Sequence, residues 1–542
     1  MRPVPLGRLR PAVVADSRLV YVGGSPPASP NDARPMPRPM SRLDAAYRVT
    51  ERLWWGVSVR GIVILVATLT LVRLWAADHA GLLFDEPYYW LWSQHLAAGY
   101  YDHPPMVAFW IRLGTLLLGD SVLGIRIVFL INVIAVSVAT YAMGRVLFDR
   151  RTAEHAALWT NTLPLIGIAG MLATPDGPSV LFWTLTVLAY ALVVKTGRGA
   201  WWLAVGILAG LGAASKYTNL FLGPGIVLSL LLDPRLRRWL ISPWLWAGGL
   251  LAALAFLPVI MWNAAHDWVS FRFQFGRVAE TAFNPLDLVT LILTQPLIFN
   301  PLAAVFVVLA AWRMLKPGTP HRRELSVLFA TSVPAILFIL FQATHGAVLE
   351  HWLAPVFPSL MLAAVAVAET IPDDARYLRR IRTDVVPVAL VAMVVVFAYV
   401  TTPADRYFPG KDPVDSMRGW PEFANGIEAL REKAGAAWIA TAQYETTSEL
   451  SFELRGRATV IPVTERPRYS FEPAPDPVLL ARPALLVVRA VTDLAPFRAC
   501  FASLTEVGTL SRTGAVSTID RLVAYRAEGA KPDLLERGCD QP

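Results

Sequence analysis

Long apolar runs, separated by short polar gaps, fill the chain from residue 57 to residue 402. A helix needs about 20 apolar residues to cross the hydrocarbon core of a bilayer, and most of these runs approach that length. We expect eleven membrane-spanning helices, at residues 57–77, 121–147, 154–173, 178–194, 200–215, 218–232, 242–262, 287–312, 325–344, 352–370 and 384–402.

The apolar run 104–118 differs from the others. It is short, it opens with two prolines and it contains Arg112. These features favour a re-entrant or interfacial helix over a membrane span.

Basic residues set the orientation of the predicted spans. With 104–118 left out of the membrane and the N-terminus inside, sixteen Lys and Arg fall in the inner loops and five fall in the outer loops. Counting 104–118 as a span would reverse this distribution. The positive-inside rule therefore predicts a cytoplasmic N-terminus and an external C-terminus.

After residue 402 the pattern changes to that of a water-soluble domain. AAWIATA, ATVIPV, ALLVVR and RLVAYRAEG predict short strands, and PEFANGIEALREKA predicts a helix between them. We expect a small periplasmic α/β domain at 403–542. It holds both cysteines, and a Cys500–Cys539 disulfide and two unpaired thiols are equally compatible with the sequence.

The composition agrees with a membrane protein. Apolar residues make up 55% of the 542 residues and charged residues 17%, with a mean hydropathy of +0.46. These values exclude a soluble protein and a disordered one. The net charge of +8 is explained by the inner loops, with no need for a nucleic-acid partner. Residues 1–52 are rich in Arg and Pro and lack the apolar core of a signal peptide, which predicts a disordered cytoplasmic tail or a translation start placed too early.

Ionisable residues from distant parts of the sequence gather on the predicted outer face. Because charges at membrane depth are costly, a set of both signs predicts a polar cavity that opens outward from the domain at 53–402. The set comprises Asp85, Glu86, Asp102, His103, Arg126, Asp176, Lys216, His266, Arg272, Arg277, Glu350 and His351.

The first outer loop is the richest in chemistry. Asp85 and Glu86 precede an aromatic, amphipathic stretch that is typical of a helix lying in the interface. A carboxylate there could act as general base toward a hydroxyl at the membrane surface. The alternative is that Asp85 simply caps the helix.

The loop FDEPYYWLWSQHLAAGYYDHPPMVAFWIRLGTLLLGDSVLGIRI resembles that of the glycosyltransferase family 39 and aminoarabinose-transferase-like group. Similar pieces follow in order, at ATPDGPSVLFW, GLGAASKYTNLFLGPG, EHWLAPVFPSL and RGWPEFA, so that the resemblance covers about 55–460. It implies a GT-C fold, an α-helical membrane enzyme, and a sugar donor linked to a polyprenyl phosphate.

The resemblance also implies roles for the acidic residues. Asp85 matches the catalytic base, and Glu86 matches a partner that orients the loop and the acceptor. Asp176 matches a second acid near the active centre.

Asp102 and His103 stand where lipid A aminoarabinose transferases have Glu-Lys, a metal-binding Glu and a phosphate-binding Lys. Both depart from that pattern, since Asp is shorter and His is cationic only when protonated. His266 and Arg272 correspond to a metal-binding His and a phosphate-binding Arg. The residues themselves demand no cofactor, and the resemblance leaves room for one divalent metal at Asp102 and His266.

Release of a sugar from a lipid phosphate requires positive charge on the departing phosphate. The candidates are Lys216, Arg272, His103, Arg126 and Arg277. Glycines around Lys216 (Gly206, Gly210, Gly223 and Gly225) allow close helix approach there. Alternatively, Lys216 is a snorkelling loop lysine and Arg126 an interfacial anchor.

His345, Glu350 and His351 are either acceptor contacts or ordinary loop residues.

The sequence thus predicts an inverting glycosyltransferase of the bacterial inner membrane. It would move a hexose or pentose from a polyprenyl phosphate to lipid A, lipopolysaccharide, another glycolipid or a protein. Nucleotide-binding motifs such as GxGxxG are absent from the sequence, which disfavours a nucleotide-sugar donor. The alternatives are a protein O-mannosyltransferase and, in another class, a secondary transporter or flippase.

Overall fold

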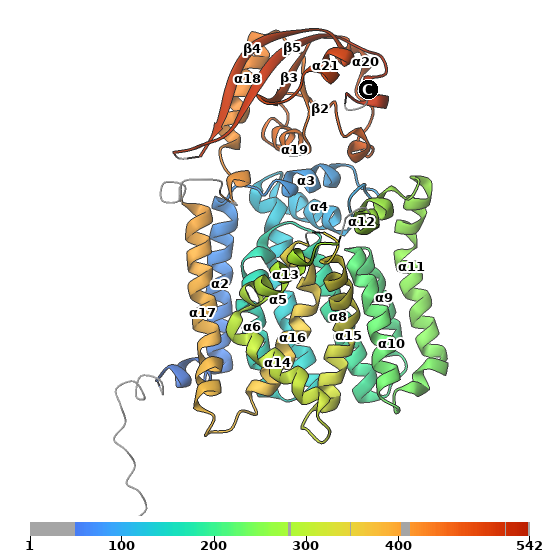
Figure 1. Cartoon of the computed structure of the whole chain (residues 1–542), viewed down its shortest axis with the longest axis vertical. Helices are drawn as coiled ribbons and strands as arrows, with labels where there is room; N and C mark the ends of the chain where they lie inside the picture. Colours follow the sequence, from blue (N-terminus) through green and yellow to red (C-terminus); the bar gives the residue numbers. More distant parts are fainter. Residues whose placement is uncertain are drawn as a thin grey trace, which may run out of the picture. The chain divides into compact units, whose positions relative to one another are not determined.

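The computed structural model describes residues 49–279, 283–346, 348–402, 412, 414–514 and 516–539. The predicted tail lies almost entirely outside this part of the chain. A helical bundle precedes an α/β domain (Figure 1). Its helices are α2 (Val59–His79), α3 (Asp85–Gln94), α4 (Met106–Leu118), α5 (Val122–Leu147), α6 (Arg150–Thr162), α7 (Pro164–Gly167), η2 (Ala169–Met171), α8 (Asp176–Thr196), α9 (Trp201–Ala213), η3 (Tyr217–Phe221), α10 (Leu222–Leu232), η4 (Arg237–Ile241), α11 (Pro243–Ala265), α12 (Val269–Ala279), α13 (Pro285–Phe299), α14 (Pro301–Leu315), α15 (Arg322–Gln342), η5 (Glu350–Val356), α16 (Phe357–Ala368) and α17 (Arg376–Thr401).

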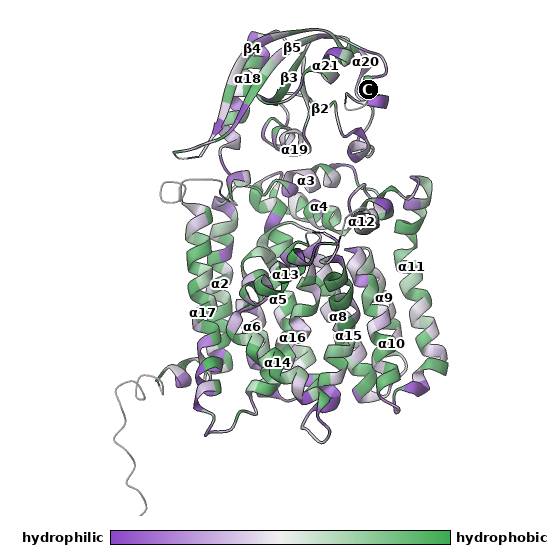
Figure 2. Cartoon of the chain, in the orientation of Figure 1, coloured by the Kyte–Doolittle hydropathy of each residue, from purple (hydrophilic) through white to green (hydrophobic). Residues whose placement is uncertain are grey.

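Hydrophobic residues predominate along the long helices of the bundle, whereas hydrophilic and hydrophobic residues mix along the elements of the α/β domain (Figure 2). Within the described residues, seven helices are long and apolar enough to cross a membrane. They become eight if the bent pair α13 and α14 counts as one span. The chain is therefore a multi-pass membrane protein.

The other three predicted spans form shorter helices. Residues 154–173 are divided among α6, α7 and η2, while α9 and α10 have 13 and 11 residues. The count of eleven spans stays a prediction. The apolar run 104–118 forms α4, 13 residues long, which packs against α3 and α5.

The predicted span at 287–312 is not one straight helix, and whether the bent pair crosses the membrane as one span stays a prediction. Residues 285–315 form two helices, α13 and α14, that meet at an angle of 108°. Asn300 adopts a left-handed backbone at the break, and its side chain caps α14 by accepting from the backbone N–H groups of Leu302 and Ala303. Pro301 follows, and proline cannot continue the preceding helix because it has no N–H and its ring clashes with the turn before it.

Small residues bring α9 and α11 together, as the glycine spacing predicts. A Cβ on Gly206 would lie 2.0 Å from the carbonyl oxygen of Gly248, and one on Gly210 would lie 2.6 Å from that of Ala252. Only glycine fits at the closest point of this contact, which is how small residues permit helix packing inside a membrane.

The α/β domain is built on one mixed sheet with the strand order β2-β1-β3-β5-β4. β1 pairs in parallel with β2 and β3, and β5 pairs antiparallel with β3 and β4. Four strands and α18 confirm the predicted elements, whereas β4 was not predicted. The elements are η7 (Asp415–Met417), α18 (Trp420–Lys433), β1 (Trp438–Thr441), α19 (Tyr444–Glu453), β2 (Val460–Pro462), η8 (Arg466–Tyr469), α20 (Pro477–Leu480), β3 (Ala484–Arg489), α21 (Ala495–Cys500), β4 (Phe501–Thr513), β5 (Thr518–Ala530) and α22 (Leu534–Arg537).

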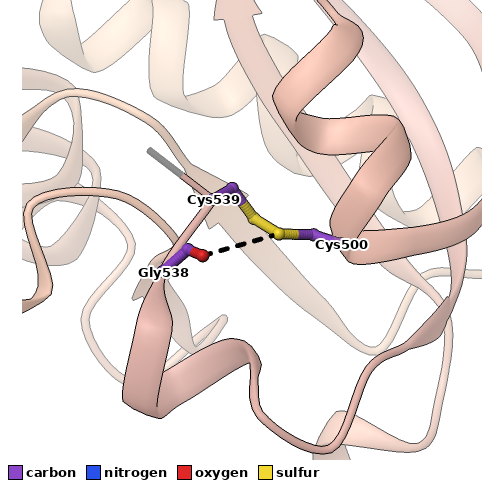
Figure 3. The surroundings of a disulfide bond; sticks show 3 residues. All are labelled: Cys500, Gly538 and Cys539. Carbon is purple, nitrogen blue, oxygen red and sulfur yellow. Dashed lines mark hydrogen bonds between the residues drawn. A yellow bond between two sulfur atoms is a disulfide. The ribbon is translucent and has the colours of Figure 1, made fainter. Parts of the chain in front are cut away.

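A disulfide joins the two cysteines of this domain. Cys500 ends α21 and Cys539 follows α22, and the bond links segments 39 residues apart (Figure 3). Both side chains are buried in one core of the domain. Of the two alternatives left by the sequence, the structure has the disulfide.

Candidate active site

The helix α3 begins with Asp85 and Glu86, and the two carboxylates have different hydrogen-bond partners. The N-cap of α3 is Phe84, and no side chain caps the helix there. The interpretation of Asp85 as a cap is therefore wrong. Glu86 instead accepts a hydrogen bond from the backbone N–H of Leu83, at 2.8 Å. This leaves the Asp85 carboxylate available for other contacts.

Glu86 is fully buried and is paired with Arg126 of α5. Arg126 Nε donates to Glu86 Oε1 at 2.8 Å, and Arg126 Nη2 donates to the other carboxylate oxygen. Glu86 Oε1 also accepts from the backbone N–H of Ala173, which precedes α8. Glu86 thus ties its loop to two helices.

The remaining donors of Arg126 are used by backbone carbonyl oxygens at the end of α2. Ala77 and Ala80 accept from Nη1, and Gly81 accepts from Nη2, all at 2.7–2.9 Å. A guanidinium has five N–H donors, and all five are now engaged. The predicted role of Arg126 in phosphate binding is therefore wrong, because it is fully buried and has no donor to offer.

A cavity of about 550 Å³ lies beside this network. Part of its wall is polar, and part consists of apolar side chains from the bundle. The polar residues that line it are Asp85, Tyr88, Tyr89, Asp102, His103, Asn132, Thr174, Asp176, Lys216, Tyr217, Thr218, Gln274, Gln342, His351, Tyr444 and Arg468. Five predicted site residues, from four separate stretches of sequence, thus line one cavity.

Asp85 faces this cavity among charges of both signs. Burial raises the pKa of its carboxyl to about 7, from an ordinary value of 3.8, and the charges of Asp102 and Glu445 raise it as well. Arg468 and a hydrogen bond from Tyr444 act in the opposite direction. A carboxylate with a pKa near neutrality is suited to accept a proton from a hydroxyl.

A second ion pair lies across the start of α8. Lys216 Nζ is 2.7 Å from Asp176 Oδ1, and His351 Nε2 is 3.6 Å from Asp176 Oδ2. Lys216 is 6% exposed, so it is not a lysine that snorkels into water. Two residues further on, the Thr218 hydroxyl is buried in the cavity wall without a hydrogen-bond partner in the described chain. This corner of the cavity offers a cation and a free hydroxyl.

Asp102 and His266, the predicted metal ligands, do not come together. Asp102 accepts from Tyr88 and Arg468, whereas His266 stacks on Trp262 and lines a separate pocket. Among the described residues, no group of three or more His, Cys, Asp or Glu could hold a metal ion. The residues that the structure describes therefore do not form the metal site implied by the resemblance.

The other predicted phosphate ligands are placed differently. His103 lines the cavity, with its Nδ1 3.5 Å from Gln274 Nε2. Arg272 is exposed and is not part of the cavity wall. The side chain of Arg277 lies outside the described residues.

Sequence reasoning missed the two cavity residues Tyr444 and Arg468. His351 was grouped with the residues of the predicted outer-face cavity, but its role was left open between an acceptor contact and a loop residue. Tyr444 and Arg468 come from the α/β domain, and Arg468 lies beyond the stretch that carries the resemblance. No local pattern marks RPRY, the segment of Arg468, as part of a membrane cavity.

A family model for dolichyl-phosphate-mannose-protein mannosyltransferases matches residues 102–262. The lipid A galacturonosyltransferase RgtD of Rhizobium johnstonii (strain DSM 114642 / LMG 32736 / 3841) is 25% identical over 402 residues, which are 73% of this chain and 82% of RgtD.

Two solved structures of ArnT from Cupriavidus metallidurans share the fold at 15% identity. The structure bound to undecaprenyl phosphate has a TM-score of 0.63 and covers 88% of this chain and 100% of ArnT. The apo structure has a TM-score of 0.60 and covers 87% and 99%. Together with the family model and RgtD, they agree with the resemblance carried by the sequence motifs: the chain is similar to the glycosyltransferase family 39 and ArnT-like group of GT-C membrane glycosyltransferases.

Proposed function

We propose that the chain is an inverting glycosyltransferase that moves one sugar from a polyprenyl phosphate to a lipid acceptor. The reaction would take place at the outer face of the bacterial inner membrane. The donor sugar is a hexose or a pentose, and the acceptor is lipid A, lipopolysaccharide or another glycolipid.

The observation that carries this proposal is the composition of the cavity. The lining includes the Asp85 carboxylate, Lys216, the Thr218 hydroxyl, which has no hydrogen-bond partner among the described residues, and many apolar side chains. A base, a cation and an apolar surface are what a hydroxyl, a phosphate and a polyprenyl chain require of one site. The apolar wall includes Val133, Val136, Leu165, Ile166, Phe221 and Phe338.

The chemistry is a single displacement at the anomeric carbon. The acceptor oxygen forms a bond to that carbon while the bond to the carrier phosphate breaks, and the phosphate leaves with the electron pair. Asp85 accepts the proton of the acceptor hydroxyl. Lys216 stabilises the charge that develops on the phosphate. One displacement inverts the configuration of the sugar.

The relatives support the lipid reading of the acceptor. RgtD is named for transfer of galacturonic acid to lipid A, and ArnT has been solved with undecaprenyl phosphate. A protein O-mannosyltransferase is the second candidate, because the matched family model describes that activity. The transporter alternative gains less support, since the cavity is lined in part by the α/β domain outside the spanning helices.

Replacement of Asp85 by Asn tests the base. The variant keeps the size of the side chain but cannot accept the proton, so transfer should fall about 10²- to 10⁴-fold with donor binding intact. The measurement is sugar transfer by purified protein in detergent. Glu86→Gln is the comparison variant, because a carboxylate that does not face the cavity should affect the folding yield more than the rate of transfer.

Mass spectrometry of lipid A, other glycolipids and glycoproteins from a deletion strain and its parent identifies the acceptor. Loss of one sugar from a lipid fraction supports the proposal, whereas loss from proteins alone supports the second candidate. Unchanged lipids and proteins would contradict both.

The proposed orientation is tested separately with reporter fusions. Fusions at Arg150, Arg237 and Arg379 should read cytoplasmic, and fusions within 414–514 should read periplasmic. An external signal at Arg150 would mean that α4 crosses the membrane.

A further inference from the structure

The α/β domain forms part of the wall around Asp85. α19 packs on α3, and two residues of the domain, Tyr444 and Arg468, line the same cavity as Asp85. Phe452 and Tyr469 of this domain are buried in one apolar cluster with Tyr88 and Trp92 of α3. The helix α3, which carries the proposed base, therefore packs between α19 of the α/β domain and α4 of the bundle.

Asp102 fixes the position of Arg468. Arg468 Nη1 donates to Asp102 Oδ1 at 2.5 Å, and the Tyr88 hydroxyl donates to Asp102 Oδ2 at 2.7 Å. The Tyr88 hydroxyl also lies 3.2 Å from the carbonyl oxygen of Arg468, and Gln274 Nε2 donates to the carbonyl oxygen of Asp102 at 2.6 Å. The guanidinium is thus attached to the loop between α3 and α4.

Aromatic rings surround the same guanidinium. Its central carbon lies 5.0 Å from the ring of Tyr444, 5.3 Å from that of Tyr101 and 5.2 Å from that of Phe273. Cation–π contacts of this kind favour a fixed arrangement of ring and cation. The Tyr444 hydroxyl then reaches Asp85 Oδ1 at 3.5 Å, a long hydrogen bond of the kind that tightens when substrate binds.

We propose that Tyr444 and Arg468 are positioning residues: Arg468, held by Asp102, fixes the ring of Tyr444, and the Tyr444 hydroxyl orients the Asp85 carboxylate toward the acceptor. This inference rests on the proposed role of Asp85 as base. It assigns to the α/β domain a direct part in the reaction centre.

The charges around Asp85 make this arrangement measurable. Asp102 lies on the loop after α3, Glu445 on α19 and Arg468 on η8, and the phenols of Tyr89 and Tyr444 lie nearby. His103 and the pair of Lys216 and Asp176 line the same cavity. Arg468 and Tyr444 lower the pKa of Asp85, whereas Asp102 and Glu445 raise it.

The experiment is the pH dependence of kcat/KM for sugar transfer by the full-length protein, in the parent and two variants. Loss of the cation in Arg468→Gln should move the acid limb of the profile to higher pH, by on the order of one pH unit. Loss of the anion in Glu445→Gln should move the limb to lower pH. Glu445 does not line the cavity and pairs with Arg489, so its removal leaves the cavity wall intact.

Two further variants separate position from charge. Tyr444→Phe should also move the limb upward, by less than Arg468→Gln, and should lower kcat because the carboxylate loses its orientation. Relative to Arg468→Gln, Arg468→Lys should bring the pH of the acid limb closer to the parent value than it brings kcat. Lysine keeps the charge but lacks the planar group that stacks on the rings. In an Asp85→Asn background, Arg468→Gln should add little to the loss of rate, since both act on one group.

Arg498→Gln is the matched control, an exposed arginine of the same domain that should leave rate and profile unchanged. Shifts of Arg468→Gln and Glu445→Gln in opposite directions support the inference. An unmoved acid limb in Arg468→Gln, or the same direction of shift in both variants, would overturn it. Full activity of Asp85→Asn would instead overturn the proposed base.

Discussion

Asp85 and Glu86 are adjacent in sequence and open the same helix, yet they lie in opposite environments. Glu86 is sealed beneath the loop, where Arg126 and two backbone N–H groups satisfy its carboxylate. Asp85 lines the cavity with one long hydrogen bond from Tyr444, and burial, followed by its acidic neighbours, raises its pKa. The Glu86 carboxylate is therefore fully hydrogen-bonded, whereas the Asp85 carboxylate can still accept hydrogen bonds or a proton from a ligand.

The two basic residues Arg126 and Lys216 differ in the same way. Arg126 has used all five donors, three of them on backbone carbonyl groups that end α2. Lys216 has one acidic partner and lies beside an unpaired hydroxyl in the cavity wall. We infer that a saturated ion pair maintains the fold and that an incompletely satisfied one binds a ligand. The predictions below test this distinction.

The largest effect is expected for the sealed pair. Arg126→Met leaves the buried Glu86 carboxylate without its cation and with only two backbone N–H donors, which should lower the free energy of unfolding by about 3–5 kcal/mol. Thermal unfolding in detergent measures this loss. The double variant Arg126→Met/Glu86→Gln should recover part of it, because the buried charge is removed. If Arg126→Met is as stable as the parent but binds the donor more weakly, Arg126 binds phosphate and its structural role is contradicted.

Lys216→Ala should act on binding and leave the fold intact. Loss of a charge-assisted contact to phosphate is worth about 1.5–3 kcal/mol, a roughly ten- to hundredfold loss of transfer at limiting donor. The control is Lys195→Ala at the other end of α8, where the lysine pairs with Glu324 away from the cavity. Parent-level transfer at limiting donor would remove Lys216 from the phosphate site.

A smaller effect is expected in the pH dependence of stability. The folded-state pKa of Asp85, about 7, lies above its ordinary value of 3.8, so the folded protein binds the proton more tightly. The carboxyl therefore stabilises the fold below about pH 4, and this contribution is lost as the pH rises to about 7. Asp85→Asn cannot ionise, so it should exceed the parent in stability at pH 8 by about 1–2 kcal/mol, and much less at pH 5. An equal difference in the free energy of unfolding between Asp85→Asn and the parent at pH 5 and pH 8 would contradict the raised pKa.

The smallest effect is expected for an ion pair at the surface. Arg150 pairs with Glu154 one turn along α6, and its side chain is 67% exposed. Arg150→Gln should change the free energy of unfolding by less than about 0.5 kcal/mol. A larger loss would mean that the solvent exposure of an ion pair does not predict how much the pair stabilises this protein.

Most of the helical elements could be predicted because their signal is local. Apolar runs located the helices of the bundle, and the alternation after residue 402 located four of the five strands. β4 was missed because Phe501–Thr513 is an edge strand with mostly exposed residues and a bulge at Gly508, so its sequence lacks a regular apolar alternation. The bend at Asn300 was missed because hydropathy does not record backbone direction.

The site was predicted in part for a similar reason. Asp85, Asp176 and Lys216 stand in polar gaps beside apolar runs, where an ionisable residue attracts notice. Arg126 was assigned wrongly, since three of its acceptors are backbone carbonyl oxygens, which every residue has. Tyr444 and Arg468 could not be found, because they are more than 350 residues from Asp85 and come from another domain.

The sequence by itself thus determined a multi-pass membrane protein with an α/β domain, its resemblance to a family of membrane glycosyltransferases, and several of the ionisable residues that line the cavity. Those properties depend on composition, on periodicity and on short motifs. Only the tertiary structure decided which charges are saturated and which remain available. The burial and the hydrogen-bond partners of a side chain depend on segments that are distant in the chain. Asp85 and Glu86 therefore differ because of the residues that surround them in the fold, although they are adjacent in the sequence.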